Sequence, residues 1–174
     1  MQDFYDRAKH IKLAIFDVDG VLTDGSLYLT DDGQELKAFN SLDGHGLKML
    51  KQTGVELAII TGRTSKLVQQ RAKNLGITHL YQGVENKIEA FLHLTETLQL
   101  APDAAAYMGD DVVDLPVMRR CGLAISVPDA PEMVKAHSHY VTKKGGGRGA
   151  VREICEMIMH AQGTYNTHMA KYLL

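Results

Sequence analysis

The chain has 174 residues, of which 45% are hydrophobic and 23% charged, and this is the composition of one globular domain with enough residues for a core. Its formal net charge of −2 gives no electrostatic basis for binding nucleic acid or an anionic membrane surface. No apolar run reaches the length of a membrane-spanning helix, and the N-terminal residues lack the apolar core of a signal peptide. Cys121 and Cys155 fall in apolar patterns without metal-site spacing, which predicts buried thiols in a reducing compartment.

The first third of the chain predicts a buried strand, a hairpin and a helix. Residues 1–10 form a polar lead-in that allows a helical turn. The run from Leu13 to Phe16 shows no polar alternation, which is typical of a strand buried on both faces of a parallel sheet. Residues 25–40 contain two short β-like runs around an Asp-Asp-Gly turn, which indicates a hairpin. Residues 42–53 have helical periodicity.

The rest of the chain alternates between strands and helices. This alternation favours a three-layer α/β sandwich with a mostly parallel, doubly wound sheet. We expect a single domain over residues 1–174, with a hairpin flap at 25–40 and a C-terminal tail at 163–174. The further strands are predicted at 55–60, 77–81, 104–109, 123–127 and 139–142, and the helices at 65–75, 86–98, 115–121, 131–136 and 150–161.

Two of these helices have apolar stripes that are expected to face the core. A flexible, basic, glycine-rich loop is predicted at 143–149, before the last helix. The stripes comprise Ile88, Phe91, Leu92 and Leu98 in the helix at 86–98, and Val151, Ile154, Cys155 and Ile158 in the helix at 150–161.

Two carboxylates follow the first predicted strand. Asp17 stands at the strand end, Asp19 is two residues further on, and Gly20 allows a sharp turn with room for a ligand. In open α/β sheets, ligands bind outside the carboxyl ends of the strands. Asp17 is suited to attack phosphorus as a nucleophile, and Asp19 to serve as general acid and then general base. Taken alone, the same residues fit an acidic turn equally well.

Polar residues follow other strands in a way that suits phosphoryl transfer. A phosphate dianion and an attacking carboxylate repel each other, so a cation must lie between them. Mg²⁺ prefers carboxylate oxygens, and Asp110 is the best remaining ligand beside Asp17. Thr61 and Lys87 are suited to donate hydrogen bonds to phosphoryl oxygens. Each alone has a plainer reading: a helix entry for Thr61, a solvated lysine for Lys87, and a helix cap for the acids after residue 109.

Together, DVDGVLT, ITGR, a lysine that opens a helix, and GDDVVD resemble the four motifs of haloacid dehalogenase-like phosphatases, over residues 12–161. The resemblance implies Mg²⁺ as cofactor and an aspartyl-phosphate intermediate. It also implies a role for each matching residue: Asp17 as nucleophile and metal ligand, Asp19 as acid/base and as metal ligand through its backbone carbonyl, Thr61 and Lys87 on the phosphoryl group, Asp110 on the metal, and Asp111 and Asp114 as supports.

The chain has no large cap insertion between these motifs. Its hairpin, KAFNSLDGHG, ITGRTSKLVQQR, LGITHLYQG and GGGRGAVREIC are similar to the family of 3-deoxy-D-manno-octulosonate 8-phosphate phosphatases. That similarity implies hydrolysis of a small phosphorylated sugar acid for the lipopolysaccharide inner core, with Gly62 and Arg63 joining Asp19 and Lys87 in substrate binding. It also implies a cytoplasmic homotetramer whose hairpins pack around a central barrel.

Three alternatives remain open from the residues. A nine-carbon sugar-acid phosphate is an equally suitable substrate. A phospho-accepting receiver domain also combines Asp, Thr, Lys and Mg²⁺. It carries its paired acids after the first strand and its phosphorylated Asp after the third, whereas here DxD follows the first strand and the second pair of acids follows the fourth. A non-catalytic interaction module is the third. We further expect that the hairpin assembles an oligomer. The tail, hinged at Gly163, either closes over a neighbour's active site or is a disordered end.

Overall fold

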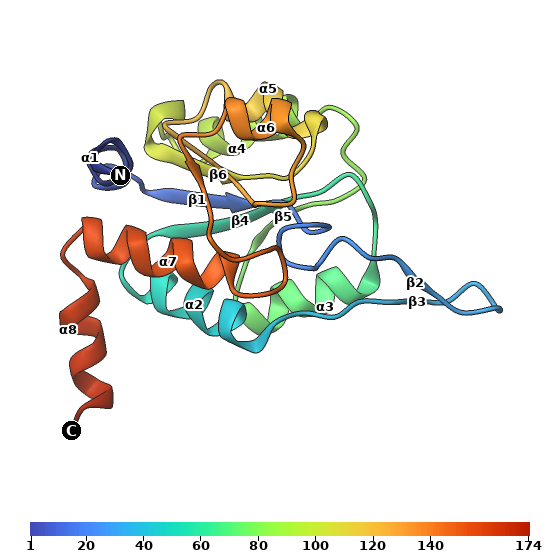
Figure 1. The fold of residues 1–174 in the computed structure, drawn as a ribbon, viewed down its shortest axis with the longest axis horizontal. Helices are drawn as coiled ribbons and strands as arrows, with labels where there is room; N and C mark the ends of the chain where they lie inside the picture. Colours follow the sequence, from blue (N-terminus) through green and yellow to red (C-terminus); the bar gives the residue numbers. More distant parts are fainter.

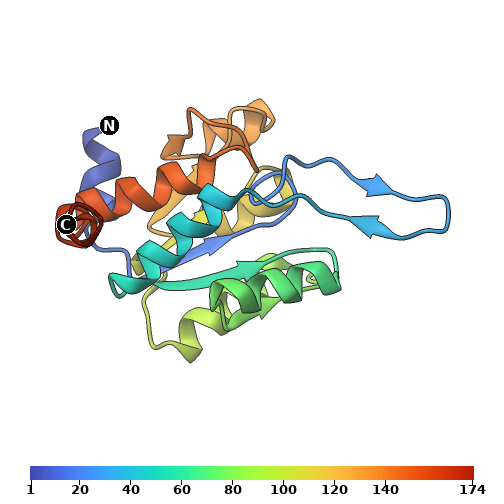
Figure 2. The same cartoon turned by 90° about the horizontal axis from the view of Figure 1, so that it is seen from below.

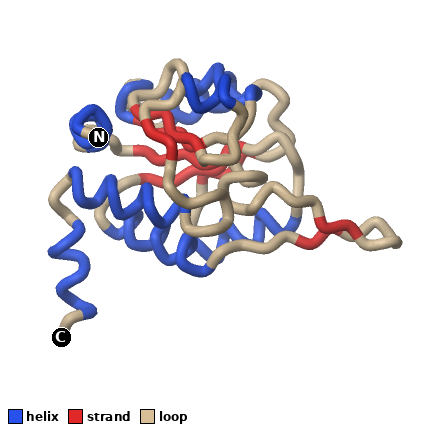
Figure 3. Tube along the Cα trace, viewed as in Figure 1, coloured by secondary structure: helices blue, strands red, loops and turns tan.

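A parallel six-stranded sheet forms the centre of the computed structural model, which describes residues 1–174 (Figures 1 and 3). Every neighbouring pair of its strands runs in the same direction. The strand order is β5 (His79–Tyr81), β4 (Glu56–Ile60), β1 (Leu13–Phe16), β6 (Ala105–Met108), β7 (Leu123–Ser126) and β8 (Tyr140–Val141).

Helices cover both faces of this sheet (Figure 1). The three-layer α/β sandwich expected from the sequence is therefore confirmed. One face carries α2 (Ser41–Gln52), α3 (Lys66–Leu75) and α7 (Ala150–Ala161), and the other carries α4 (Lys87–Thr97), α5 (Leu115–Met118) and α6 (Glu132–Ala136). The N-terminal helix α1 (Gln2–Ala8) packs against α7, and short 3₁₀ turns occupy Pro102–Ala104, Val112–Asp114 and Ala170–Tyr172.

Local sequence explains where several elements begin and end. All four residues of β1 are buried, as a strand between two helical layers requires. Asn40 caps α2 by accepting hydrogen bonds from the backbone N–H groups of Leu42 and Asp43. Ser65 caps α3 in the same way, and Gly76 ends that helix with a left-handed φ of 70°. The helices thus start and stop close to the predicted residues.

Two predictions about the helices are wrong in detail. Leu92 on α4 is 41% exposed instead of core, because the helix turns its Phe91 and Leu94 side toward the sheet. Helix α5 ends at Met118 and does not continue to Gly122. At Gly122 the chain already turns into β7, and a Cβ there would lie 1.8 Å from the backbone oxygen of Asp103.

The hairpin and the tail extend from this layered body. Strands β2 (Tyr28–Leu29) and β3 (Glu35–Leu36) pair antiparallel, separately from the main sheet, and Figure 2 shows that they project away from it. This confirms the predicted hairpin. The tail continues from α7 into α8 (Tyr165–Met169), so it is helical.

The core is one cluster of buried apolar side chains around the sheet. It includes the predicted inward face of α7, whose Ile154, Cys155 and Ile158 are buried. Cys121 is buried as well, and both cysteines are free thiols, as predicted. None of the helices combines the length and apolar character needed to cross a bilayer.

Candidate active site

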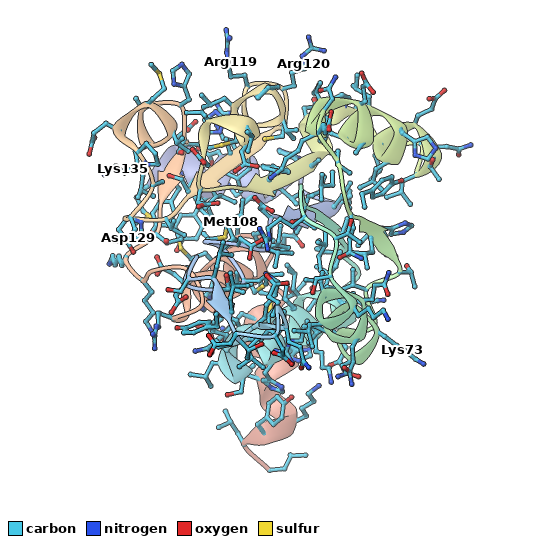
Figure 4. The ribbon with its side chains drawn as sticks, turned by 90° about the vertical axis from the view of Figure 1, so that its right-hand side faces the viewer. Lys73, Met108, Arg119, Arg120, Asp129 and Lys135 are labelled. Carbon is cyan, nitrogen blue, oxygen red and sulfur yellow. The ribbon has the colours of Figure 1, made fainter.

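The polar residues that follow the strands meet at one edge of the sheet. The chain passes from β1 to β4 and β5 on one side, and then returns to β6 on the other side of β1. Such a reversal in an open α/β sheet creates the crevice in which ligands bind. Figure 4 looks onto this edge, with Met108, the last residue of β6, near its centre. Phe16 pairs with Met108, so Asp17 and Asp110 leave adjacent strands close together.

A cavity of about 540 Å³ opens at this edge. A hollow of about 610 Å³ lies elsewhere, between α4, α5 and α6, and contains no carboxylate. Of the predicted site residues, only Asp114 does not line the carboxylate-rich cavity, because it lies buried beneath it. The lining includes Asp17, Asp19, Thr61, Gly62, Arg63, Lys87, Asp110 and Asp111.

Lys87 joins two of the acids under the cavity. Its Nζ donates to Asp17 Oδ2 at 2.6 Å and to Asp114 Oδ1 at 2.7 Å, and its side chain is only 3% exposed. Burial works against the charge on Lys87, but the attraction of Asp17 and Asp114 outweighs burial and raises the pKa of the ammonium. Lys87 is therefore a fixed positive charge at the foot of the cavity.

Asp114 holds the loop that carries Asp110. Its Oδ2 accepts hydrogen bonds from the backbone N–H groups of Asp110 (3.0 Å) and Asp111 (3.1 Å). Its Oδ1 accepts from Lys87 and from the hydroxyl of Tyr107 at 2.7 Å. The Asp111 carboxylate accepts from the N–H of Val112 and caps the following turn. Asp114 lies fully buried beneath the cavity, whereas Asp17 and Asp110 line it and are therefore the carboxylates placed to face a cation.

The arrangement suits a small divalent cation. One carboxylate oxygen from each of Asp17, Asp110 and Asp114 lies within 4.8 Å of the others. Burial, followed by repulsion from Asp114, raises the pKa of Asp17 to about 6. Burial, followed by repulsion from Asp17 and Asp114, raises the pKa of Asp110 to about 7. Lys87 is one cation beside these three carboxylates, so the cluster keeps an excess of negative charge. A hard cation such as Mg²⁺ would neutralise this excess.

Close backbone approaches shape the loop after β1. Gly20 has φ +83°, and a Cβ at this position would lie 2.1 Å from Asp110 Oδ2. Gly146 approaches Gly20 as well, since a Cβ at Gly146 would lie 1.8 Å from the backbone oxygen of Gly20. The N–H of Gly147 donates to the backbone oxygen of Val21 at 2.9 Å. The glycine-rich loop before α7 is therefore packed against the turn that follows Asp17. The prediction of a flexible loop is wrong for Gly146 and Gly147.

Asp19 contacts the hairpin. Its Oδ1 accepts a hydrogen bond from Lys37 Nζ at 2.6 Å, and Arg63 Nε lies 3.9 Å from its Oδ2. Glu35 pairs with both cations, at 3.2 Å from Lys37 Nζ and 3.0 Å from Arg63 Nη2. The hairpin therefore contributes charged groups to the entrance of the cavity.

Lys37, Glu35 and Tyr107 are site residues that the sequence did not reveal. Lys37 and Glu35 read as ordinary polar positions of a hairpin strand, and Tyr107 as an apolar strand residue. A carboxylate that follows a strand has a predictable location. In contrast, Lys37 contacts Asp19 only because of the path of the hairpin base, and the Tyr107 hydroxyl finds its partner only because Asp114 lies beside it.

Known proteins resemble the chain over most of its length. The family model of haloacid dehalogenase-like hydrolases matches residues 27–122. The 3-deoxy-D-manno-octulosonate 8-phosphate phosphatase KdsC of Escherichia coli strain K12 is 51% identical over 161 residues, which are 92% of this chain and 86% of that protein.

Solved structures agree with this result. A probable YrbI family phosphatase of Pseudomonas syringae has a TM-score of 0.99 and 52% identity, covering 100% of this chain and 99% of that one. The 3-deoxy-D-manno-octulosonate 8-phosphate phosphatase of Moraxella catarrhalis, solved with a magnesium ion, a phosphate ion and a KDO molecule, has a TM-score of 0.97 and 48% identity, covering 99% of each chain.

Proposed function

The chain belongs to the haloacid dehalogenase-like hydrolase family, and we propose that it hydrolyses 3-deoxy-D-manno-octulosonate 8-phosphate to the free sugar acid and inorganic phosphate. The observation that carries this proposal is the cavity in which Asp17, Asp19, Lys87 and Asp110 meet. The phosphatases that are about half identical to this chain over nearly its whole length support the choice of substrate.

The reaction proceeds in two displacements on phosphorus. Asp17 attacks the phosphorus atom, the bond from phosphorus to the sugar oxygen breaks, and the phosphoryl group is carried by the Asp17 carboxylate. Asp19 gives a proton to the departing sugar oxygen. It then takes a proton from water as that water attacks the aspartyl-phosphate, which releases phosphate and restores Asp17. Asp19 is therefore protonated again at the end of each cycle.

The remaining residues bind and balance charge. The cofactor is Mg²⁺. Asp17, Asp110 and the backbone carbonyl of Asp19 would hold it, and when bound it would offset negative charge on the phosphoryl oxygens. Lys87 neutralises Asp17 between turnovers and donates to a phosphoryl oxygen, as does the Thr61 hydroxyl. Asp114 fixes the loop that carries Asp110.

The polar mouth of the cavity suits a sugar acid. The Arg63 side chain is 49% exposed at this mouth, beside Gly62, and provides a cation for a substrate carboxylate. A nine-carbon sugar-acid phosphate carries the same groups and is the alternative substrate. Comparing kcat/KM for the eight-carbon and nine-carbon phosphates distinguishes them, and a preference of at least about tenfold for the eight-carbon compound is expected.

We also propose that the chain works as one catalytic domain, residues 1–174, within a cytoplasmic homotetramer that serves lipopolysaccharide synthesis. Exposed apolar side chains on the hairpin support assembly through the flap at 25–40. Tail residues 163–174 would reach a neighbour's site by rotation at Gly163, and the exposed Tyr172 and Leu173 would make the contact. Two free buried thiols suit a reducing compartment.

Substitution of the nucleophile tests the mechanism. Asp17→Asn removes the attacking carboxylate with little change in shape, so we expect no measurable phosphate release, while circular dichroism and mass in solution stay as in the wild type. Asp19→Asn should lower kcat by about 10²–10⁴-fold. Turnover by folded Asp17→Asn at the wild-type rate would rule out the aspartyl-phosphate route.

A further inference from the structure

Lys37 carries a cation that is nearly closed off from solvent, and it lies outside the four motif positions. It follows β3 at the base of the hairpin, and its side chain is only 2% exposed. Its Nζ lies 2.6 Å from Asp19 Oδ1, the length of a strong charge-assisted hydrogen bond. An enclosed lysine side chain has few accessible rotamers. The hydrogen bond from Lys37 therefore restricts the orientation of the Asp19 carboxylate as well.

The contact belongs to a ring of four alternating charges. Asp19 contacts Lys37 and, at 3.9 Å, Arg63, while Glu35 contacts the same two cations from the hairpin side. The two cations differ in burial, because the Arg63 side chain is 49% exposed and that of Lys37 is nearly closed off from solvent. The half-exposed Arg63 can turn toward a ligand by leaving Glu35, whereas Lys37 is enclosed by its contacts.

We propose that Lys37 is a positioning residue for the acid/base Asp19, and that the base of the hairpin supplies it to the active site. This inference rests on the proposed role of Asp19 in phosphate-ester hydrolysis. The ammonium holds one carboxylate oxygen of Asp19 and thereby sets where the other oxygen meets the leaving group. When the Asp19 proton passes to the sugar oxygen, the carboxylate that remains already faces its counter-ion.

The proposal predicts a dependence on the leaving group. Departure of a poor leaving group needs a well-placed acid, whereas 4-nitrophenolate leaves without one. For Lys37→Met, we expect kcat/KM to fall about 10–100-fold with phenyl phosphate but less than about threefold with 4-nitrophenyl phosphate. kcat/KM covers only the steps up to departure of the leaving group. A series of aryl phosphates therefore gives the slope of log(kcat/KM) against the pKa of the leaving group, and this slope measures the dependence on the acid.

Two variants serve as references for this slope. Lys66→Met removes a lysine from the exposed start of α3, near the same edge, and should leave the slope as in the wild type. Asp19→Asn removes the acid itself and should give the steepest slope. Lys37→Gln, which keeps a hydrogen-bond donor, should fall between the wild type and Lys37→Met, and it provides the measurement if Lys37→Met does not fold.

The outcomes separate this proposal from the proposed function. A steeper slope in Asp19→Asn, with wild-type slopes in both folded Lys37 variants, would overturn the positioning role and keep the acid. An unchanged slope in Asp19→Asn would overturn the acid role itself. Equal losses of kcat/KM across the whole series in Lys37→Met would mean that Lys37 supports the fold only, which also overturns the proposal.

Discussion

Lys87 balances two carboxylates in a place that water hardly reaches. The exposed fractions of the Lys87 and Asp114 side chains are 3% and 0%. The desolvation of such a group is offset only while its partners remain in contact. Lys87 therefore contributes to the fold in addition to its proposed role in phosphate binding, and the two roles are separable by experiment.

Lys87→Met should destabilise the metal-free protein. The substitution leaves Asp17 and Asp114 buried next to Asp110 without their cation, and loss of one partner from a buried pair costs about 3–5 kcal/mol. Urea unfolding in EDTA measures the change. The exposed Lys48→Met on α2 is the control, with an expected change within about 0.5 kcal/mol. A Lys87→Met protein as stable as the control would show that the pair adds nothing to folding.

Binding of Mg²⁺ should depend on pH. Asp17 and Asp110, with pKa values of about 6 and about 7 raised chiefly by burial, hold protons in neutral or mildly acidic solution. Mg²⁺ binds the ionised carboxylates, so protons compete with it and its affinity should weaken as the pH falls from 8 to 6. Titration calorimetry in buffers of different ionisation enthalpy should detect proton release at pH 6.5. Equal affinity at pH 6 and pH 8 would contradict these pKa values.

The same shifts have a consequence for stability. Both carboxylates ionise near 3.8 in the unfolded chain and at higher pH in the fold. The unfolded state therefore loses protons first, and the stability of the metal-free protein should fall as the pH rises from about 4 to about 7, then level off. Thermal unfolding in EDTA measures this fall, and added Mg²⁺ should reverse it.

Among the elements, the glycine-rich loop before α7 supports the catalytic turn from behind. Gly146 lies against the backbone of Gly20, and the Asp43 side chain on α2 accepts hydrogen bonds from the N–H groups of Gly149 and Arg152 at the start of α7. Helices α2 and α7 thus hold the loop in place. The shape of the turn that follows Asp17 therefore depends on a segment more than a hundred residues away.

Gly146→Ala should therefore lower activity without any contact with substrate. The new Cβ would lie 1.8 Å from the Gly20 oxygen, so the turn after Asp17 has to move. We expect kcat to fall at least about tenfold, since a displacement of about 1 Å costs about 10²-fold. Gly145→Ala is the matched control, because its Cβ would meet only the Asp129 side chain, at 3.2 Å. Similar kcat values for the two variants would refute the supporting role of the loop.

For the whole molecule, the hairpin presents more apolar surface than its size can stabilise. Its strands are two residues long, and a lone hairpin is marginal in water. Leu27, Leu29 and Leu36 are each at least 50% exposed. This exposed apolar surface supports the proposal that another subunit covers the hairpin.

Charged substitutions on the hairpin should therefore dissociate the proposed oligomer. For Leu29→Asp combined with Leu36→Asp, light scattering coupled to gel filtration should give the monomer mass. Leu92→Asp, on the exposed side of α4, should keep the wild-type mass. An oligomer of unchanged mass in the hairpin double variant would exclude the hairpin as the site of assembly.

Much of the sheet and the carboxylate cluster was predictable because uninterrupted apolar runs identify buried strands. A residue such as Asp17, directly after such a run, has its location fixed by the sheet. What escaped prediction depends on contacts between distant segments. Lys37 reaches Asp19 only because the hairpin base folds back, and Leu92 is exposed because the orientation of α4 favours Phe91. The receiver alternative is excluded by the family match.

The burial of both cysteines gives the protein an internal reporter of its own opening. Burial raises the pKa of Cys121 to about 12, and the pKa of Cys155 is raised further by burial and by Asp43. Thiolate, the form that reacts with alkylating reagents, is thus scarce in the closed fold. The rate of alkylation then measures how often α7 or the start of β7 detaches. A cysteine introduced at the hairpin tip would accept a fluorophore selectively, so that exchange of subunits in the proposed oligomer could be followed by energy transfer.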